Sequence, residues 1–293
     1  PKFDSVEAIY TSLLSNLDAA IGMMDNGGLN GDILFGGNMN GWKVMANTIK
    51  MRIALRMADV DPSTAASVFN AAYNSGVIGQ GGDLHYPYLT SDAFDNPWQD
   101  AFQTRYDFVV SELFIDHLKA TGDPRLPYMA DGTPISNGTE YVGLEYGLEN
   151  PGILETLLSG IDGRIIYDGT QQGGWIATYA EVCFAMAEAN QRGWTTVGDT
   201  LTWLKLGIQA SCERWGVPSA SAASFAASAT LGSNPMETIA MAKWTDMFLQ
   251  GYEAWTEWRR LDFPVLSPPA AAITGTGVPV RNGYGGLVPL RIR

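Results

Sequence analysis

Apolar side chains recur every three to four residues over most of this 293-residue chain, which is the spacing of α-helices that bury one face. The clearest segment is 42–57, whose apolar stripe includes Trp42, Met45, Ile49 and Ile53. Further helices are predicted after the N-cap Asp4 and over 62–75, 106–121, 176–191, 199–214 and 236–261. We therefore predict an all-α protein of helical hairpin repeats, similar to a tetratricopeptide array but without its strict repeat length.

Two long stretches, 79–105 and 126–175, break this periodicity with glycine, proline and aromatic residues. Loops of this length are usually functional or carry short strands of their own. The Ser/Ala-rich segment 218–233 is predicted to be a flexible connection, and the tail from Pro264 to be extended and irregular. The sequence therefore predicts one helical domain with two loop-rich insertions.

The chain is acidic, with a net charge of −13 and a pI near 4.5. Such a charge repels nucleic acid and anionic membrane surfaces, so neither is expected as a direct partner. No run of apolar residues is long enough to span a bilayer. No signal peptide is visible, so the protein is either cytosolic or has lost a targeting segment. Cys183 and Cys212 favour two buried thiols, although one disulfide is conceivable.

Most catalytic and metal-binding signatures are absent. The chain has no G-x-S-x-G, H-E-x-x-H or P-loop motif, and its only histidines are His85 and His117. The loops 25–32 and 131–140 carry oxygen ligands of the kind that calcium prefers, but neither has EF-hand spacing. Ordinary polar loops are the favoured interpretation. We expect no cofactor and no metal, with calcium as the open alternative.

Glu253 and Glu257 are the strongest acid/base candidates, because both lie on one face of the predicted helix 236–261 beside Trp255 and Trp258. Glycosidases use two carboxylates separated by roughly 5 or 6.5–9.5 Å. Like charges four residues apart repel each other unless cations pair them. Arg260 is one such cation, so a structural ion-pair network is favoured over catalysis.

Lys50, Arg52 and Arg56 place scarce positive charge on the predicted helix 42–57, in a chain with only 18 basic residues. Arg52 and Arg56 lie four positions apart and share a helix face. Arginine binds a carboxylate through two hydrogen bonds and stays charged when buried. We expect both arginines to point between helices at acidic partners such as Glu181, Glu188, Glu253 or Glu257.

These same residues carry a resemblance to a known family. The segment WKVMANTIKMRIALRMADVDP (42–62) resembles the W-x-x-x-A-N-S-L-x-x-R-x-A-x-R segment of SusD/RagB-like outer-membrane lipoproteins. KWTDMFLQGYEAWTEWRRLDFP (243–264) resembles the family's K-W-x-A-L-F-x-Q-G-x-E-A-W-x-E-Y-R-R-T-G-Y-P. Four shorter motifs stand in the family's order: NPW (96–98), DPRL (123–126), YAEVCFAMAEANQRGW (179–194) and GIQASCERWGV (207–217). The likeness covers nearly the whole chain.

The sequence also departs from the family pattern. Ala242 stands where the family often has Gln, and Leu261-Asp262 replace its Thr-Gly. The opening residues resemble the middle of a family member, and the final PLRIR resembles the start of a closing R-x-x-Y-P motif. We therefore expect a single SusD-like domain over 1–293, truncated at both ends and lacking a lipid-anchored start.

The resemblance implies a non-enzymatic protein at the outer surface of the outer membrane, held there by a lipid anchor. Such a protein captures a nutrient, usually a glycan, for a SusC-like TonB-dependent transporter. The ligand would be an oligosaccharide or, in some relatives, a peptide. The resemblance also implies tetratricopeptide-like helices with a loop-rich ligand region, here about 79–105 and 126–175.

Sugars present apolar C–H faces that stack on exposed aromatic rings. Because binding residues concentrate on loops, the candidates for ligand contact are the aromatic residues of the two insertions: Tyr86, Tyr88, Trp98, Tyr141, Tyr146 and Trp175. Helix aromatics such as Trp42, Trp244 and Trp255 are assigned to the core by their periodicity. Two alternatives remain open: a helical-barrel glycoside hydrolase that uses Glu253 and Glu257, and a scaffold that binds peptides or proteins.

Overall fold

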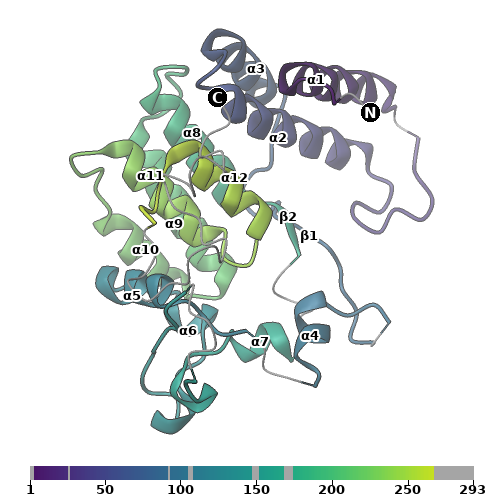
Figure 1. Cartoon of the computed structure of the whole chain (residues 1–293). Coiled ribbons are helices and arrows are strands. Elements are labelled where there is room, and N and C mark those ends of the chain that lie inside the picture. The colour runs from purple at the N-terminus through teal and green to yellow at the C-terminus, as the bar shows by residue number, and fades with distance from the viewer. Residues whose placement is uncertain are drawn as a thin grey trace. The chain divides into compact units, whose positions relative to one another are not determined.

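The structure is a computed structural model that describes residues 3–25, 27–91, 93–104, 108–146, 152–167 and 174–266 (Figure 1). Within these ranges the chain is mostly helical, which confirms the all-α prediction. The helices are α1 Val6–Met23, α2 Met39–Met57, α3 Pro62–Asn74, α4 Pro97–Phe102, α5 Glu112–Thr121, α6 Leu126–Met129, α7 Gly163–Ile166, α8 Tyr179–Gln191, α9 Thr200–Trp215, α10 Ser219–Ser228, α11 Pro235–Asp246 and α12 Gly251–Leu261. Strands β1 Leu84–His85 and β2 Trp175–Ala177 pair antiparallel, and short 3-10 turns cover Pro134–Ser136 and Glu155–Leu157.

The chain forms two compact units, each with its own core. The first unit contains residues 1–87 and 175–207. The second contains Tyr88–Gly174 and continues from Ile208 onward. Each unit is therefore assembled from two separate stretches of sequence.

In the first unit, α2 and α3 form an antiparallel hairpin (Figure 1). The turn between them is short because Asp61 caps α3 through the backbone N–H of Thr64, and Pro62 takes the first helical position. The hairpin buries its facing side chains together with those of α8: Met51, Leu55, Phe69, Val182 and Met186 are among them. This core explains the apolar stripe in 42–57.

Two further side chains of the segment 42–62, those of Asn47 and Trp42, form hydrogen bonds to neighbouring parts of the chain. The buried Asn47 side chain donates to the carbonyls of Ser75 and Gly76, which end α3 without a helical partner. The Trp42 indole donates to Asp32 at 2.9 Å. The polar positions of this segment therefore hold neighbouring loops in place.

Helix α1 leaves much of its apolar face uncovered. Its half-buried side chains, Tyr10, Leu14, Leu17 and Ile21, form one stripe on a helix that packs on α2. The adjacent stripe of Val6, Ile9 and Leu13 is exposed. The cap is also one residue later than predicted, because Ser5 rather than Asp4 accepts the hydrogen bond from Ala8.

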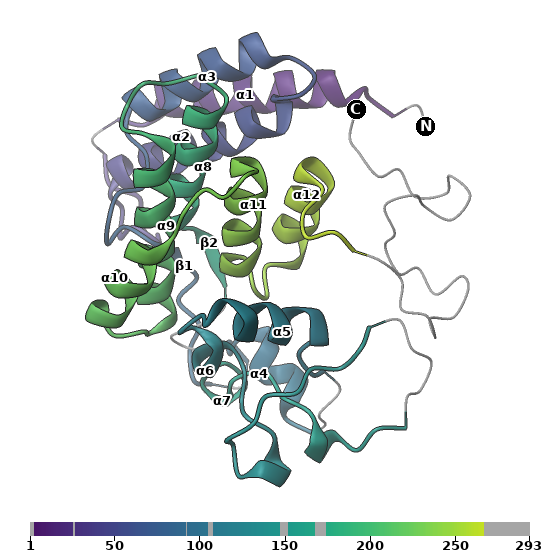
Figure 2. The same cartoon turned by 90° about the vertical axis from the view of Figure 1, so that its left-hand side faces the viewer.

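The second unit packs α5, α6, α7, α9 and α11 around a separate core. Its buried members include Phe114, Ile115, Leu118, Ile165 and Trp215. Aromatic rings of α11 and its following turn complete it, with Phe248 stacked on Phe114 at 4.6 Å. Helices α11 and α12 lie side by side in this unit (Figure 2).

The predicted single helix 236–261 is wrong, since the structure divides it into α11 and α12. Leu249 adopts a φ of 66° in the connection, a left-handed conformation that ends helical hydrogen bonding. The break also changes the helical phase. Trp255, assigned to the core by periodicity, is 38% exposed, whereas Trp258 is buried.

Three other boundaries differ from the sequence prediction. The segment 218–233 was expected to be flexible but contains α10, because Ala222 and Ala226 are buried four positions apart on one face. The helix expected over 106–121 begins at Glu112, since residues just before it form backbone hydrogen bonds with other loops. The helix expected from 176 begins at Tyr179, after β2. Most of the tail that begins at Pro264 lies outside the described residues.

Candidate functional site

The structure separates the six aromatic candidates between the two units. Tyr86 and Trp175 belong to the first unit, and Tyr88, Trp98, Tyr141 and Tyr146 to the second. Tyr86 is 41% exposed, and Trp175 in β2 lies against the imidazole of His85 in β1 at 4.7 Å. Within the first unit, Tyr86 directly follows β1 and Trp175 lies in β2. The two candidate rings therefore come from neighbouring segments of the β1–β2 ladder.

The four second-unit candidates have different surroundings. Tyr88 lies against Gly174, where an added Cβ would meet its ring at 2.4 Å. Tyr146 is half-buried at the edge of a described segment. Trp98, in α4, packs edge-on against Phe108 and lines a hollow of about 350 Å³ with Phe114, Trp244 and Phe248. That hollow is almost wholly apolar.

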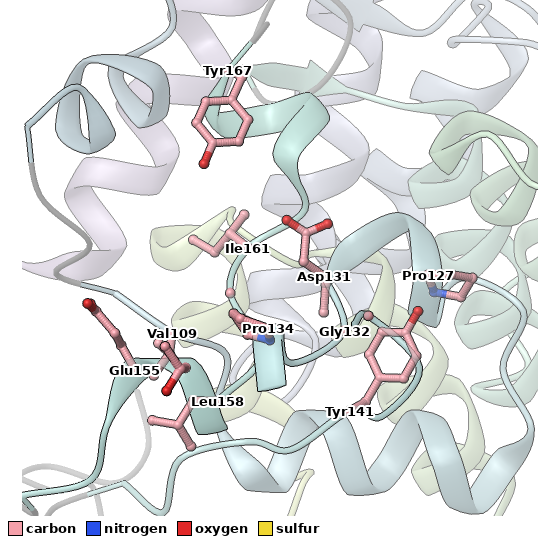
Figure 3. Close-up of a pocket in the computed structure, with 14 residues that line it drawn as sticks. Val109, Pro127, Asp131, Gly132, Pro134, Tyr141, Glu155, Leu158, Ile161 and Tyr167 are labelled. Carbon is pink, nitrogen blue, oxygen red and sulfur yellow. The ribbon is translucent and has the colours of Figure 1, made fainter. Parts of the chain in front are cut away.

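Tyr141 lines a larger cavity of about 640 Å³, which lies wholly within the second unit (Figure 3). A volume of this size fits a ligand of a few sugar rings, since ligand sites usually measure about 300–1,000 Å³. The lining combines rings, carboxylates, prolines and exposed backbone: Val109, Pro127, Ala130, Asp131, Gly132, Pro134, Gly138, Tyr141, Glu155, Thr156, Leu158, Gly160, Ile161 and Tyr167. This cavity is the candidate site.

Its wall is built from extended segments that hydrogen-bond without forming a regular sheet. Ala130 and Ile161 form an isolated antiparallel bridge, and the N–H of Asp131 donates to Gly160 at 3.1 Å. Nearby, Ser159 links two further segments: its N–H donates to Val142 and its carbonyl accepts from Val110. These hydrogen bonds explain why no helical or strand periodicity appears in 126–175.

A tight turn over 133–140 forms one edge of the cavity. The N–H of Thr133 donates to the carbonyl of Glu140 at 2.7 Å, and Ser136 accepts from the N–H groups of Thr139 and Glu140. Gly132 lies directly against this turn, because an added Cβ there would be 2.2 Å from the carbonyl oxygen of Gly138. A side chain at position 132 is therefore incompatible with this turn.

Asp131 carries the most perturbed carboxylate of the lining. Burial and the neighbouring charge of Asp162 raise its pKa, while a hydrogen bond from Gly163 and the charge of Arg164 act in the opposite direction. Burial, together with Asp131 and Asp162, also raises the pKa of Tyr141. The phenol of Tyr141 therefore keeps its proton and remains available as a hydrogen-bond donor.

Tyr167 lies across the cavity from Tyr141, with its hydroxyl directed toward the other lining residues and Asp131 between them (Figure 3). Its side chain is 61% exposed and sits beside Gly163. Tyr167 was not among the aromatic candidates predicted from the sequence, although it lies in the same aromatic-rich insertion. Tyr167 lies six residues after Ile161, and both residues line the cavity. Only the three-dimensional structure shows that Tyr167 belongs to the site.

Glu257, one of the two carboxylates considered for catalysis, has a structural environment instead. Glu257 is buried and accepts hydrogen bonds from Lys243 and Arg260, each at 2.5 Å. Burial opposes its ionisation, but the charges of Arg260 and Lys243 outweigh this and lower its pKa. A glycosidase acid needs a raised pKa, so this geometry supports the ion-pair interpretation.

For Arg52, the expected pairing with a carboxylate of another helix is confirmed. Its Nε and Nη2 donate to both carboxylate oxygens of Glu181 at 2.6 and 2.7 Å, and Nη2 also donates to the carbonyl of Ile176. Lys50 pairs with Asp18 of α1. The positive charge on α2 therefore joins α2 to α8 and α1.

The loops considered for calcium show other roles for some of their carboxylates. Asp32 accepts hydrogen bonds from the backbone of Leu34, Phe35 and Gly37 and from Trp42. Across the part of the chain that the structure describes, no three His, Cys, Asp or Glu side chains gather as metal ligands do. Calcium dependence stays an untested prediction. Cys183 and Cys212 are both buried thiols rather than a disulfide.

The family profile described as "Starch-binding associating with outer membrane" matches residues 1–285. The chain belongs to this SusD-like family. The match covers the α2 segment, the cavity and the α11–α12 motif together. No curated protein showed a significant match to the chain.

Solved SusD-like structures share its fold. A chitin-binding protein is 27% identical, with a TM-score of 0.80 over 98% of this chain and 67% of its own. A SusD homolog from Bacteroides fragilis is 23% identical, with a TM-score of 0.79 over 95% of this chain and 68% of its own. A SusD-like protein from Bacteroides thetaiotaomicron is 19% identical, with a TM-score of 0.78 over 93% of this chain and 64% of its own. This SusD-like chain thus spans about two thirds of the length of each.

Among the residues described, none of the helices is both long and apolar enough to cross a membrane.

Proposed function

We propose that this chain is the ligand-binding part of a cell-surface glycan-binding protein that does not itself cleave its ligand. The observation that supports this most directly is the 640 Å³ cavity, with Tyr141 and Tyr167 on its sides, in a chain of the SusD-like family. Aromatic rings stack on the C–H faces of sugars, and Asp131, Glu155 and Thr156 supply acceptors and donors for hydroxyl groups. The name of the chitin-binding relative supports a glycan ligand.

The first experiment is calorimetric titration with malto-oligosaccharides, chito-oligosaccharides and a peptide panel, with a reducing-end assay on the same samples. Saturable sugar binding without new reducing ends is expected. Release of reducing ends would instead indicate a hydrolase, and binding of peptides alone would indicate a peptide scaffold.

The substitution Tyr167→Ala tests whether the sugar binds in the 640 Å³ cavity. Because the Tyr167 side chain is largely exposed, its removal should change the free energy of unfolding by less than about 0.5 kcal/mol. Loss of a stacking ring should weaken sugar binding by about fivefold, since such stacking contributes roughly 1 kcal/mol. Tyr252→Ala is the matched control, because Tyr252 is a 92% exposed tyrosine on α12, outside the cavity lining. Equal affinities of the two variants would place the sugar elsewhere.

We further propose that the protein is held at the outer face of the outer membrane and delivers its ligand to a SusC-like TonB-dependent transporter. The family description, which associates its members with the outer membrane, supports this. Affinity purification of the full-length protein from detergent-solubilised outer membranes should recover such a transporter in stoichiometric amounts. Recovery of the protein alone, or its protection from protease added to intact cells, would contradict the proposal.

A further inference from the structure

The charges around the 640 Å³ cavity have one predominant sign. The described lining residues include two carboxylates, Asp131 and Glu155, and contain no lysine, arginine or histidine. The two carboxylates come from different segments of the wall, one before the 133–140 turn and the other in the Glu155–Leu157 turn (Figure 3). A ligand inside the cavity therefore meets acidic groups on more than one side.

The described cations that contact the cavity wall or its neighbouring carboxylates do not reverse this balance. Arg164 is paired at 2.7 Å with Asp162, a buried carboxylate whose charge acts on Asp131. Lys119 donates to the backbone carbonyl of Tyr141 and is exposed to solvent. Three carboxylates, Asp131, Asp162 and Glu155, thus face two cations, and the net charge of −13 on the whole chain adds to the negative potential.

The described lining also contains hydrogen-bond acceptors that carry a negative charge but no hydrogen-bond donors that carry a positive charge. Tyr141 and Tyr167 can stack on a sugar or donate a hydroxyl proton, whereas ionised Asp131 and Glu155 can only accept. A protonated amine is the group that best satisfies two ionised carboxylates, because its hydrogen bonds to them are charge-assisted. A carboxylate or sulfate on the ligand would instead be repelled and find no cation in the lining.

We infer that the cavity selects glycans that carry free amino groups over neutral glycans of the same length, and that it rejects glycans that carry carboxylate or sulfate groups. This specificity rests on the proposed glycan-binding function and deepens it by naming the class of ligand. The geometry that supports it is the placement of Asp131 and Glu155 within one cavity beside two tyrosine rings.

The test compares three length-matched β-1,4-linked probes by calorimetry: N-acetylated chito-oligosaccharide, its deacetylated form, and a cello-oligosaccharide oxidised to carboxylates. At about pH 6 an amine of this kind is largely protonated while exposed carboxylates remain ionised. At low ionic strength the deacetylated probe should bind about fivefold tighter than the acetylated one, and the oxidised probe at least about fivefold weaker. The preference should shrink at about 1 M salt, where the screening length falls to about 3 Å.

The double variant Asp131→Asn and Glu155→Gln should abolish the preference, so that the deacetylated and acetylated probes bind with equal affinity. Asparagine keeps the oxygen that accepts from Gly163, so the wall retains its hydrogen bond. Asp116→Asn, an exposed position on α5 outside the cavity, is the matched control and should keep the preference. The salt series on the unaltered protein gives a second readout if the double variant folds poorly.

Two outcomes separate this inference from the proposed function. If the acetylated probe binds as tightly as the deacetylated one, or only malto-oligosaccharides bind, the amine preference is overturned and glycan binding stands. If no sugar binds, both proposals fail.

Discussion

The helical framework and the cavity wall are held together by different interactions. In the framework, partly or fully buried ion pairs join helices that are distant in sequence, as Arg52 of α2 joins Glu181 of α8. In the cavity wall, main-chain hydrogen bonds join irregular segments, as between Asp131 and Gly160. The framework therefore depends on side-chain identity, whereas the wall depends on where the backbone can approach itself.

This difference determines what each region tolerates. Removing one partner of a buried ion pair destabilises the fold, because the remaining charge stays buried without a counter-charge. The second unit contains a clear example in Lys243, Glu257 and Arg260, where one buried carboxylate serves two cations. A wall of backbone hydrogen bonds is instead sensitive to added volume, and Gly132 is the position where volume is most restricted.

The largest effect is expected for Glu257→Gln. The substitution keeps the shape of the side chain but removes the buried negative charge with which Lys243 and Arg260 both pair. It should lower the free energy of unfolding by about 3–5 kcal/mol, measured by urea denaturation. Glu145→Gln is the control, since Glu145 is exposed and should change stability by less than about 0.5 kcal/mol. If the two variants unfold alike, the buried network does not hold α11 to α12.

Gly132→Ala tests the wall in the opposite way. A Cβ at this position would lie 2.2 Å from the carbonyl oxygen of Gly138, so the 133–140 turn must move. The expected cost is about 1–3 kcal/mol of stability, together with a loss of sugar affinity in the calorimetric titration. Gly160→Ala is the matched control on the same cavity, because an added Cβ there meets no atom within 4 Å. A Gly132→Ala protein that binds sugar normally would show that the turn does not shape the site.

The helical framework was largely predictable from sequence because its information is local and periodic. The helix 42–57 and the cap at Asp61 follow from spacing and capping chemistry, and the Arg52 pairing follows from the capacity of arginine to bind a carboxylate through two hydrogen bonds. The failures have the same origin. Periodicity alone cannot show that Leu249 adopts a positive φ, so the phase of α12, and with it the exposure of Trp255, was missed.

The cavity was only partly predictable. Tyr141 was nominated as a loop aromatic and lines the cavity, whereas Tyr167 and Glu155 were not nominated. Their approach depends on backbone pairing such as Ala130 with Ile161, which leaves no repeating pattern in the sequence. The ligand role of all six nominated aromatics stays a prediction until sugar binding is measured.

Ionisation of a carboxylate should affect the free energy of unfolding with opposite signs in the framework and in the cavity wall. Partial burial opposes ionisation of Asp32, but hydrogen bonds from Phe35, Gly37 and Trp42 outweigh it and lower its pKa from 3.8 to about 2. The ionised form thus stabilises the fold above the unfolded-state pKa, and this contribution is lost as the pH falls from 3.8 through about 2. Asp131 has the opposite sign: its folded-state pKa is raised, so the penalty of its ionisation is relieved as the pH falls through that pKa toward 3.8.

Unfolding free energies measured against pH for Asp32→Asn and Asp131→Asn separate the two contributions. Relative to the unaltered protein, Asp32→Asn should destabilise at neutral pH and become equivalent as the solution is acidified below about pH 2, where Asp32 itself is protonated. Asp131→Asn should be relatively most favourable at neutral pH and lose that advantage on acidification, because the unaltered protein then gains stability by protonating Asp131. Two curves of the same sign would contradict the contrast, since they would mean that the cavity carboxylate is stabilised in its ionised form as the framework carboxylate is.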